Sequence, residues 1–172
     1  MRSIGQVFQV FELSLNMKKH NYAIQLEWTG NKGSGTFDYR SYSRSHKIII
    51  EGKPTDLLGS SDPNFRGDAT RYNPEELFLS SISACHMLWY LHLCSDNGVI
   101  VHEYIDKAEG IMAEEVNGSG HFKEVTLKPQ VIVTKAEMVD KAESLHHEAS
   151  KMCFIANSLN FDVGHQAEIV VM

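Results

Sequence analysis

The 172-residue chain lacks an excess of basic residues, a long apolar run and an even number of cysteines. Its formal net charge of −6 argues against a nucleic-acid-binding protein, because such proteins usually carry a basic face. Its most apolar stretch, residues 77–93, holds three serines and two histidines and is shorter than the roughly 20 residues that span a bilayer. The first twenty residues contain no continuous apolar segment, so no secretory signal is expected.

The three cysteines are a poor count for a secreted disulfide framework. We therefore expect a reducing, cytoplasmic setting, where thiols are more often catalytic or metal-binding than structural. The nine histidines show no HxxxH or HExxH spacing, and the cysteines form no CxxC pair. No metal site is predicted from these patterns.

Hydrophobic periodicity predicts an α+β domain with the element order β-β-β-α-β-β-α-β. Residues 1–17 are expected to be an N-terminal extension, with Met17 as an alternative start, and residues 18–172 to form one domain. Predicted strands cover residues 22–28, 36–39, 46–51, 99–115, 122–134 and 163–172, with the first two joined as a hairpin and the fourth and fifth joined by a turn at 117–120. A long loop is predicted over residues 52–72.

The first predicted helix has a well-marked beginning and end. Asn73 is a good N-cap, Pro74 suits the first helical position, and the next two residues are glutamates, which favour the positive end of the helix dipole. The helix is expected to run to about Asn97, before Gly98. Its apolar residues surround nearly the whole cylinder, so a sheet or a second subunit must bury it.

Two cysteines on different predicted helices are the candidate reactive residues. Cys85 lies on the first helix, and Cys153 lies on the apolar stripe of a second predicted helix at residues 136–157. Cys94 comes nine residues after Cys85, about 180° around the helix and roughly 13 Å along it, so core packing is expected there. Free cysteines are often buried, so packing is also the alternative for the other two.

A reactive Cys85 requires a nearby cation, because an unperturbed thiol has a pKa of about 8.5 and burial disfavours the thiolate. Arginines are available before the helix, at Arg66 and Arg71, and after the first predicted hairpin, at Arg40 and Arg44.

A carboxylate such as Glu75 could fix the guanidinium in a bidentate pair. Ten residues of straight helix separate Glu75 from Cys85 by about 15 Å. Contact of both with one arginine therefore predicts a bend or restart of the helix between Ser80 and Ser83.

The motif Asn-Pro-Glu-Glu-Leu at residues 73–77, followed by Ala84-Cys85 and by a second cysteine 68 residues on, resembles the OsmC/Ohr family of thiol peroxidases. The resemblance covers about residues 22–172. It implies an OsmC-like fold and an intertwined homodimer, with the long apolar helices at its centre and the active sites near the subunit interface.

Carried over by position, the resemblance makes Cys85 the peroxidatic cysteine and Cys153 the resolving cysteine. Glu75 matches the glutamate that holds the active-site arginine. In the OsmC branch that arginine falls in the loop before the motif, which points to Arg66. In the Ohr branch it comes from the first hairpin, which makes Arg44 the second choice.

The implied activity is reduction of organic hydroperoxides, without a metal or organic cofactor, through a sulfenate on Cys85 and then a Cys85–Cys153 disulfide that a dithiol, such as one of the lipoyl type, reduces again. Leu88 and Trp89, beside Cys85, would favour alkyl or fatty hydroperoxides. The chain departs from the family where His86 replaces an aromatic residue and Phe154 a proline. The alternatives are a non-catalytic dimer that binds a hydrophobic ligand, and a redox sensor.

Overall fold

The computed structural model describes residues 18–172, so the extension predicted at residues 1–17 lies outside the described residues. The chain divides into two compact units, one ending at Gly59 and the other beginning at Ser60. Both long helices and all three cysteines belong to the second unit.

The described part of the first unit is a three-stranded antiparallel sheet with the order β1-β2-β3. Its strands are β1 at Gln25–Trp28, β2 at His46–Ile49 and β3 at Leu57–Gly59. The predicted pairing of residues 22–28 with residues 36–39 is wrong, because β1 pairs with β2, with Leu26 opposite Ile48. The strand predicted at residues 46–51 is found as β2, whereas β3 lies inside the predicted loop at residues 52–72.

Local contacts explain why residues 36–39 do not form a strand. The Arg44 guanidinium lies over the rings of Tyr39 and Tyr42, 4.1 Å and 4.4 Å from their centroids. The same guanidinium donates hydrogen bonds to the backbone carbonyls of both tyrosines, each at 2.8 Å. These contacts hold residues 39–44 as a folded loop in place of a ladder of strand hydrogen bonds.

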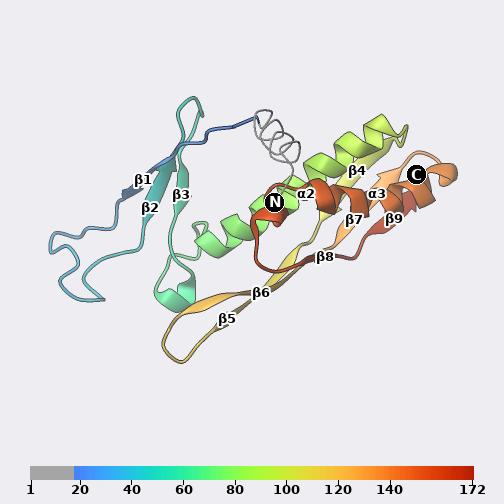
Figure 1. The fold of residues 1–172 in the computed structure, drawn as a ribbon. Helices are drawn as coiled ribbons and strands as arrows, with labels where there is room; N and C mark the ends of the chain where they lie inside the picture. The colour runs from blue at the N-terminus through green and yellow to red at the C-terminus, as the bar shows by residue number, and fades with distance from the viewer. Residues whose placement is uncertain (1–17) are drawn as a thin grey trace, which may run out of the picture. The chain divides into compact units, whose positions relative to one another are not determined.

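The long helix α2, at Pro74–Asp96, confirms the predicted helix almost to the residue (Figure 1). Asn73 Oδ1 accepts the Glu76 N–H at 2.8 Å, and Glu76 Oε2 accepts the Asn73 N–H at 3.1 Å, so the two residues form a capping box. At the other end Asn97 is the C-cap, and Gly98 follows with a positive φ of 71°.

The break predicted in α2 between Ser80 and Ser83 is wrong, because the helix is uninterrupted through these residues. The serine hydroxyls have other partners that leave the helix ladder intact. Ser81 donates to the Phe78 carbonyl at 2.7 Å, and Ser83 donates to the carboxylate of Asp106 on the neighbouring strand.

α2 is longer than the apolar stretch read from the sequence. By length and composition its 23 residues could cross a membrane, with a mean hydropathy of 1.3 over the most apolar window. Among the described residues it is the one helix of this kind. A core helix of a soluble protein meets the same criterion, so the observation is weak on its own.

Six strands of the second unit form two three-stranded sheets, with the orders β4-β7-β9 and β5-β6-β8. They are β4 at Val101–Asp106, β5 at Glu109–Glu114, β6 at Gly120–Leu127, β7 at Pro129–Val133, β8 at Val163–His165 and β9 at Glu168–Val171. Each long strand predicted from the sequence is thus two strands, and the predicted turn at 117–120 joins β5 to β6. The break between β4 and β5 lies beside the break between β6 and β7, because Asp106 Oδ1 accepts the Lys128 N–H at 2.7 Å.

The second long helix is shorter than predicted. The helix α3 runs over Val139–Met152, after a 3-10 turn at Ala136–Met138, and does not reach residue 157. Cys153 is its C-cap, with extended φ and ψ of −67° and 109°, so the prediction that Cys153 lies on the helix is wrong.

The core of the second unit lies where α2 and α3 run side by side against the strands (Figure 1). One cluster joins the two helices to β7, and its buried members are Tyr90, Cys94, Val99, Val131, Val133, Ala142, Leu145 and Ala149. A second cluster, of Ile82, Val125 and Leu127, packs the first half of α2 against β6. Cys94 is 1% exposed and belongs to the first cluster, as predicted.

Candidate active site

The fold brings together the two thiols that the sequence singled out. Cys85 lies on α2 and is half-buried, whereas Cys153 ends α3 and is 1% exposed. The two thiols are close enough for Cys85 to raise the pKa of Cys153, and neither is in a disulfide. Two thiols in contact on separate elements can form a disulfide after a modest adjustment of their side chains.

Burial and the neighbouring thiol keep Cys153 protonated. The pKa of Cys153 is raised to about 11, first by burial and then by its hydrogen bond with Cys85. The backbone N–H groups of Ala156 and Ile155 act in the opposite direction, and the Ala156 N–H lies 3.4 Å from the sulfur. At neutral pH Cys153 is therefore a thiol, and its S–H can donate to the Cys85 sulfur.

The backbone of Cys153 is fixed on both sides. Its N–H donates to the Ala149 carbonyl at 3.0 Å, and its carbonyl accepts the Asn157 N–H at 3.0 Å. The first bond belongs to the last turn of α3, and the second belongs to the short turn that follows. Since both backbone groups are engaged, the end of α3 sets the direction of the Cα–Cβ bond of Cys153.

Glu75 presents an unsatisfied acceptor in the first turn of α2. Its Oε2 is buried and has no hydrogen-bond partner among the described residues. A buried carboxylate oxygen without a donor is costly, so the site calls for a cation or another donor. On the uninterrupted helix, however, Glu75 and Cys85 stay about 15 Å apart along the axis. One guanidinium cannot contact both across that distance.

The arginines named from the sequence lie in three different settings. Arg66 follows the 3-10 turn at Pro63–Phe65, is exposed, and has a positive φ of 65°, which is uncommon for a residue with a side chain. Arg71 forms an ion pair with Asp68 at 3.4 Å. Arg44 belongs to the first unit, where two tyrosine rings hold it as described above.

An apolar, partly aromatic surface adjoins the thiol pair. Leu88 and Trp89 come one turn after Cys85 on α2, and Phe154 directly follows Cys153. The rings of Trp89 and Phe154 meet edge to face, with centroids 5.7 Å apart. The side chains of Leu88 and Phe154 are 63% and 67% exposed. Leu88, Trp89 and His92 line a small pocket of about 190 Å³.

Sequence reasoning missed a buried histidine pair next to this site. His86 Nε2 lies 3.0 Å from His146 Nδ1, and the two side chains are 2% and 0% exposed. Burial lowers the pKa of His86 to about 4 and the pKa of His146 to about 3. The ring of His165, on β8, lies 5.9 Å from each of the two rings.

The signal that could have found this pair is the place of each histidine on an apolar helix face. His86 is followed at four-residue steps by Tyr90 and Cys94, and His146 follows Leu145 on the stripe of α3. No spacing rule links residues 60 apart. Among residues 18–172, no group of three or more His, Cys, Asp or Glu side chains is placed to hold a metal ion.

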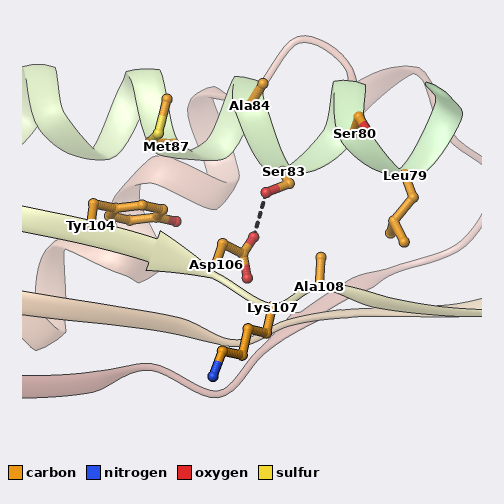
Figure 2. A pocket seen from close by; sticks show the side chains of 9 residues that line it. All are labelled: Leu79, Ser80, Ser83, Ala84, Met87, Tyr104, Asp106, Lys107 and Ala108. Carbon is orange, nitrogen blue, oxygen red and sulfur yellow. Dashed lines mark hydrogen bonds between the residues drawn. The ribbon is translucent and has the colours of Figure 1, made fainter. Parts of the chain in front are cut away.

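A larger pocket of about 420 Å³ lies on the opposite face of α2, against β4 and the two residues that follow it (Figure 2). Ser83 and Asp106 point toward one another across it, Tyr104 lies beside them, and the Lys107 side chain points away from α2. The Tyr104 hydroxyl is buried and has no partner among the described residues. Neither cysteine of the pair lines this pocket.

Comparison with known proteins agrees with the observed fold. A family model described as OsmC-like protein matches residues 67–166. An OsmC-like protein of unknown function from Vibrio cholerae aligns over 87% of this chain and 100% of its own, with 29% identity and a TM-score of 0.77. An organic hydroperoxide resistance protein from Elizabethkingia anophelis aligns over 90% and 100%, with 17% identity and a TM-score of 0.63.

A third solved structure, of a protein from Legionella pneumophila also named as an organic hydroperoxide resistance protein, aligns over 89% of this chain and 100% of its own, with 16% identity and a TM-score of 0.59. No curated protein matches the chain. The family model covers more than half of the sequence, and the α+β fold with its long helix agrees with it. The chain therefore belongs to the OsmC-like family.

Proposed function

We propose that this protein reduces organic hydroperoxides, with Cys85 as the peroxidatic cysteine and Cys153 as the resolving cysteine. The observation that carries the proposal is the contact between a half-buried thiol on α2 and a buried, protonated thiol at the end of α3. Some solved structures with this fold are named as organic hydroperoxide resistance proteins, which supports the same chemistry at the level of the family.

The first step forms a bond between sulfur and oxygen. The Cys85 thiolate attacks the terminal oxygen of the hydroperoxide, the O–O bond breaks, and the leaving alkoxide takes a proton to become an alcohol. Cys85 is left as a sulfenic acid. The sulfur has lost two electrons, and the peroxide has gained them.

The second step uses the proton that Cys153 retains. The Cys153 sulfur attacks the sulfenic sulfur, the S–O bond breaks, and the hydroxide takes the Cys153 proton and leaves as water. A small dithiol, of the lipoyl type in this proposal, then exchanges with the disulfide and restores both thiols. No metal or organic cofactor takes part in these steps.

The charged residues have supporting roles in this proposal. A guanidinium stabilises the thiolate and the developing alkoxide, with Arg66 as the first choice and Arg44 as the second. Glu75 holds the arginine through its Oε2, which has no hydrogen-bond partner among residues 18–172. Because α2 does not break, one guanidinium cannot contact Glu75 and Cys85 at the same time. In this proposal Glu75 anchors the loop that carries the arginine, and the guanidinium leaves Glu75 when it approaches Cys85.

The apolar surface beside the thiols supports an organic substrate. Leu88, Trp89 and Phe154 can accept an alkyl or aromatic group while the peroxide oxygens face Cys85. Hydrogen peroxide has no group to bury there, so it would gain nothing from this surface.

We further propose that the protein is a cytoplasmic homodimer. Three free cysteines suit a reducing compartment. α2 is apolar on nearly every side yet leaves Leu88 63% exposed, and β1 leaves Leu26 63% exposed within its own unit. A second copy would bury such surfaces. Sedimentation equilibrium should give twice the chain mass of 19.4 kDa, and a monomer at micromolar concentration would contradict this part of the proposal.

Steady-state turnover tests the proposed activity. With dihydrolipoamide as reductant, the protein should consume cumene hydroperoxide over many cycles and should use hydrogen peroxide with a kcat/KM at least about tenfold lower. Oxidation of the two thiols without sustained turnover would identify a redox sensor instead.

The pocket on the other face of α2 favours a second candidate function, binding of a hydrophobic ligand without catalysis. Its volume of about 420 Å³ and its lining, which combines Leu79 and Met87 with Ser83 and Asp106, suit a small amphipathic molecule. Thiols that stay unchanged in the presence of hydroperoxide would favour this function over the peroxidase.

A further inference from the structure

The two elements that carry the cysteines are also joined by the buried histidine pair. His86 directly follows Cys85 on α2, and His146 lies on α3, seven residues or about 10 Å before Cys153. His86 Nε2 and His146 Nδ1 lie 3.0 Å apart, so one nitrogen carries a proton and donates to the other. The same two elements are therefore linked by one thiol contact and one polar side-chain contact.

The surroundings hold the two imidazole rings nearly parallel. The rings are 3° from parallel, and Tyr90 stacks on His146 with its centroid 3.8 Å away. His165 packs against both rings from β8. Because the pair is almost completely buried, water cannot replace its hydrogen bond without opening the contact between the helices.

The other buried side chains between α2 and α3 are mainly apolar, among them Ala142, Leu145 and Ala149. Apolar packing is non-directional and tolerates small shifts of one helix along another. A hydrogen bond has a preferred distance and angle, and a single buried polar pair can fix the register of two packed helices.

We propose that the His86–His146 hydrogen bond sets the register of α2 against the end of α3 and thereby holds Cys153 where its sulfur can bond to Cys85. The two histidines are positioning residues, since they act through the cysteines. The inference rests on the proposed function only in taking Cys85 and Cys153 as the two cysteines that form the disulfide. Any oxidant can start the disulfide, and with oxidised glutathione two thiols give two electrons and two protons, leaving one disulfide and two reduced glutathiones.

The test compares two double variants in a Cys94→Ala background, so that Cys85 and Cys153 are the two remaining thiols. The variant His86→Leu/His146→Leu removes the hydrogen bond from both sides and leaves neither nitrogen unpaired. The variant His86→Gln/His146→Asn places an amide near each of the two bonding nitrogens and so keeps the bond.

Each protein is equilibrated in glutathione buffers, and the ratio of disulfide to dithiol is measured by alkylation and mass spectrometry. The leucine variant is expected to lower the equilibrium constant for the Cys85–Cys153 disulfide about tenfold, because the two sulfurs then have a lower effective concentration. The glutamine/asparagine variant should stay within about threefold of the protein with both histidines. If the amide variant keeps the equilibrium constant that the leucine variant loses, the effect comes from the hydrogen bond and not from the volume of the side chains.

A leucine variant that folds and keeps the original constant would overturn the proposal, and so would an amide variant that loses as much as the leucine variant. If the leucine variant does not fold, His86→Met/His146→Met carries the same prediction, since methionine adapts to irregular space. This measurement uses no peroxide. A protein that fails to turn over hydroperoxide but shows the predicted glutathione constants would contradict the proposed function and support the role of the histidines.

Discussion

Cys85→Ser is expected to abolish hydroperoxide reduction. A serine hydroxyl stays protonated at neutral pH and is a much weaker nucleophile than a thiolate, so the rate of alcohol formation should fall by about 10³-fold or more. The rate is measured by stopped-flow loss of cumene hydroperoxide in the presence of dihydrolipoamide. Turnover of the serine variant near the wild-type rate would place the reaction elsewhere in the chain.

Cys153→Ser and Cys94→Ala serve as matched controls for that experiment. The Cys153 variant should still react with one equivalent of hydroperoxide, but its product should be a sulfenic acid that dimedone traps, because the resolving thiol is missing. The Cys94 variant should react as the wild type does, since Cys94 packs in the core beside Tyr90. Loss of activity in the Cys94 variant while it remains folded would contradict the assigned pair.

Acid is expected to destabilise the protein through the buried histidines. The pKa of His86 is lowered to about 4, first by burial and then by His165, with Asp106 acting in the opposite direction. The pKa of His146 is lowered to about 3 by burial, His86 and His165, and the pKa of His165 is lowered by burial and by His147. In the unfolded chain these groups titrate near 6.5.

The sign of the effect follows from which state binds protons first. Above pH 6.5 the histidines are neutral in both states, so their contribution to stability is fully present. Between pH 6.5 and about 4 the histidines bind protons in the unfolded chain but not in the folded state, so the free energy of unfolding falls. The shift of His86 alone corresponds to a loss on the order of 3 kcal/mol, and the interacting rings cannot simply be added.

Urea unfolding at pH 7.5 and pH 4.5 measures this loss. The variant His86→Leu/His146→Leu is the matched control, because it keeps the surface carboxylates that also titrate in acid. It should lose less stability between the two pH values than the wild type by at least about 2 kcal/mol. Equal losses in the two proteins would show that the histidine pair does not determine the acid sensitivity.

The features that could be predicted from the sequence are those with a local cause. Asn73, Pro74 and Glu76 form a cap whose chemistry is contained in four residues, and α2 begins where they indicate. The pairing of Cys85 with Cys153 came from a resemblance in spacing, and it stays a prediction although the fold places the two thiols near each other. The core position of Cys94 followed from the tendency of free cysteines to be buried and from helix geometry, which places it opposite Cys85.

The features that could not be predicted depend on contacts between distant residues. Strand β1 has a turn signal directly after it, but it pairs with β2 because Arg44 and two tyrosines fold the intervening loop. Ser83 was expected to bend α2, but it donates to Asp106, 23 residues away. The histidine pair joins residues 60 apart, and no single-sequence rule assigns a partner across that distance.

The count of free thiols after oxidation tests the central claim most directly. One equivalent of cumene hydroperoxide per chain, added without reductant, is predicted to lower the number of free thiols from three to one. The peptide map should show Cys94 unmodified and Cys85 joined to Cys153. Three thiols that survive the treatment, or a disulfide that includes Cys94, would contradict the account.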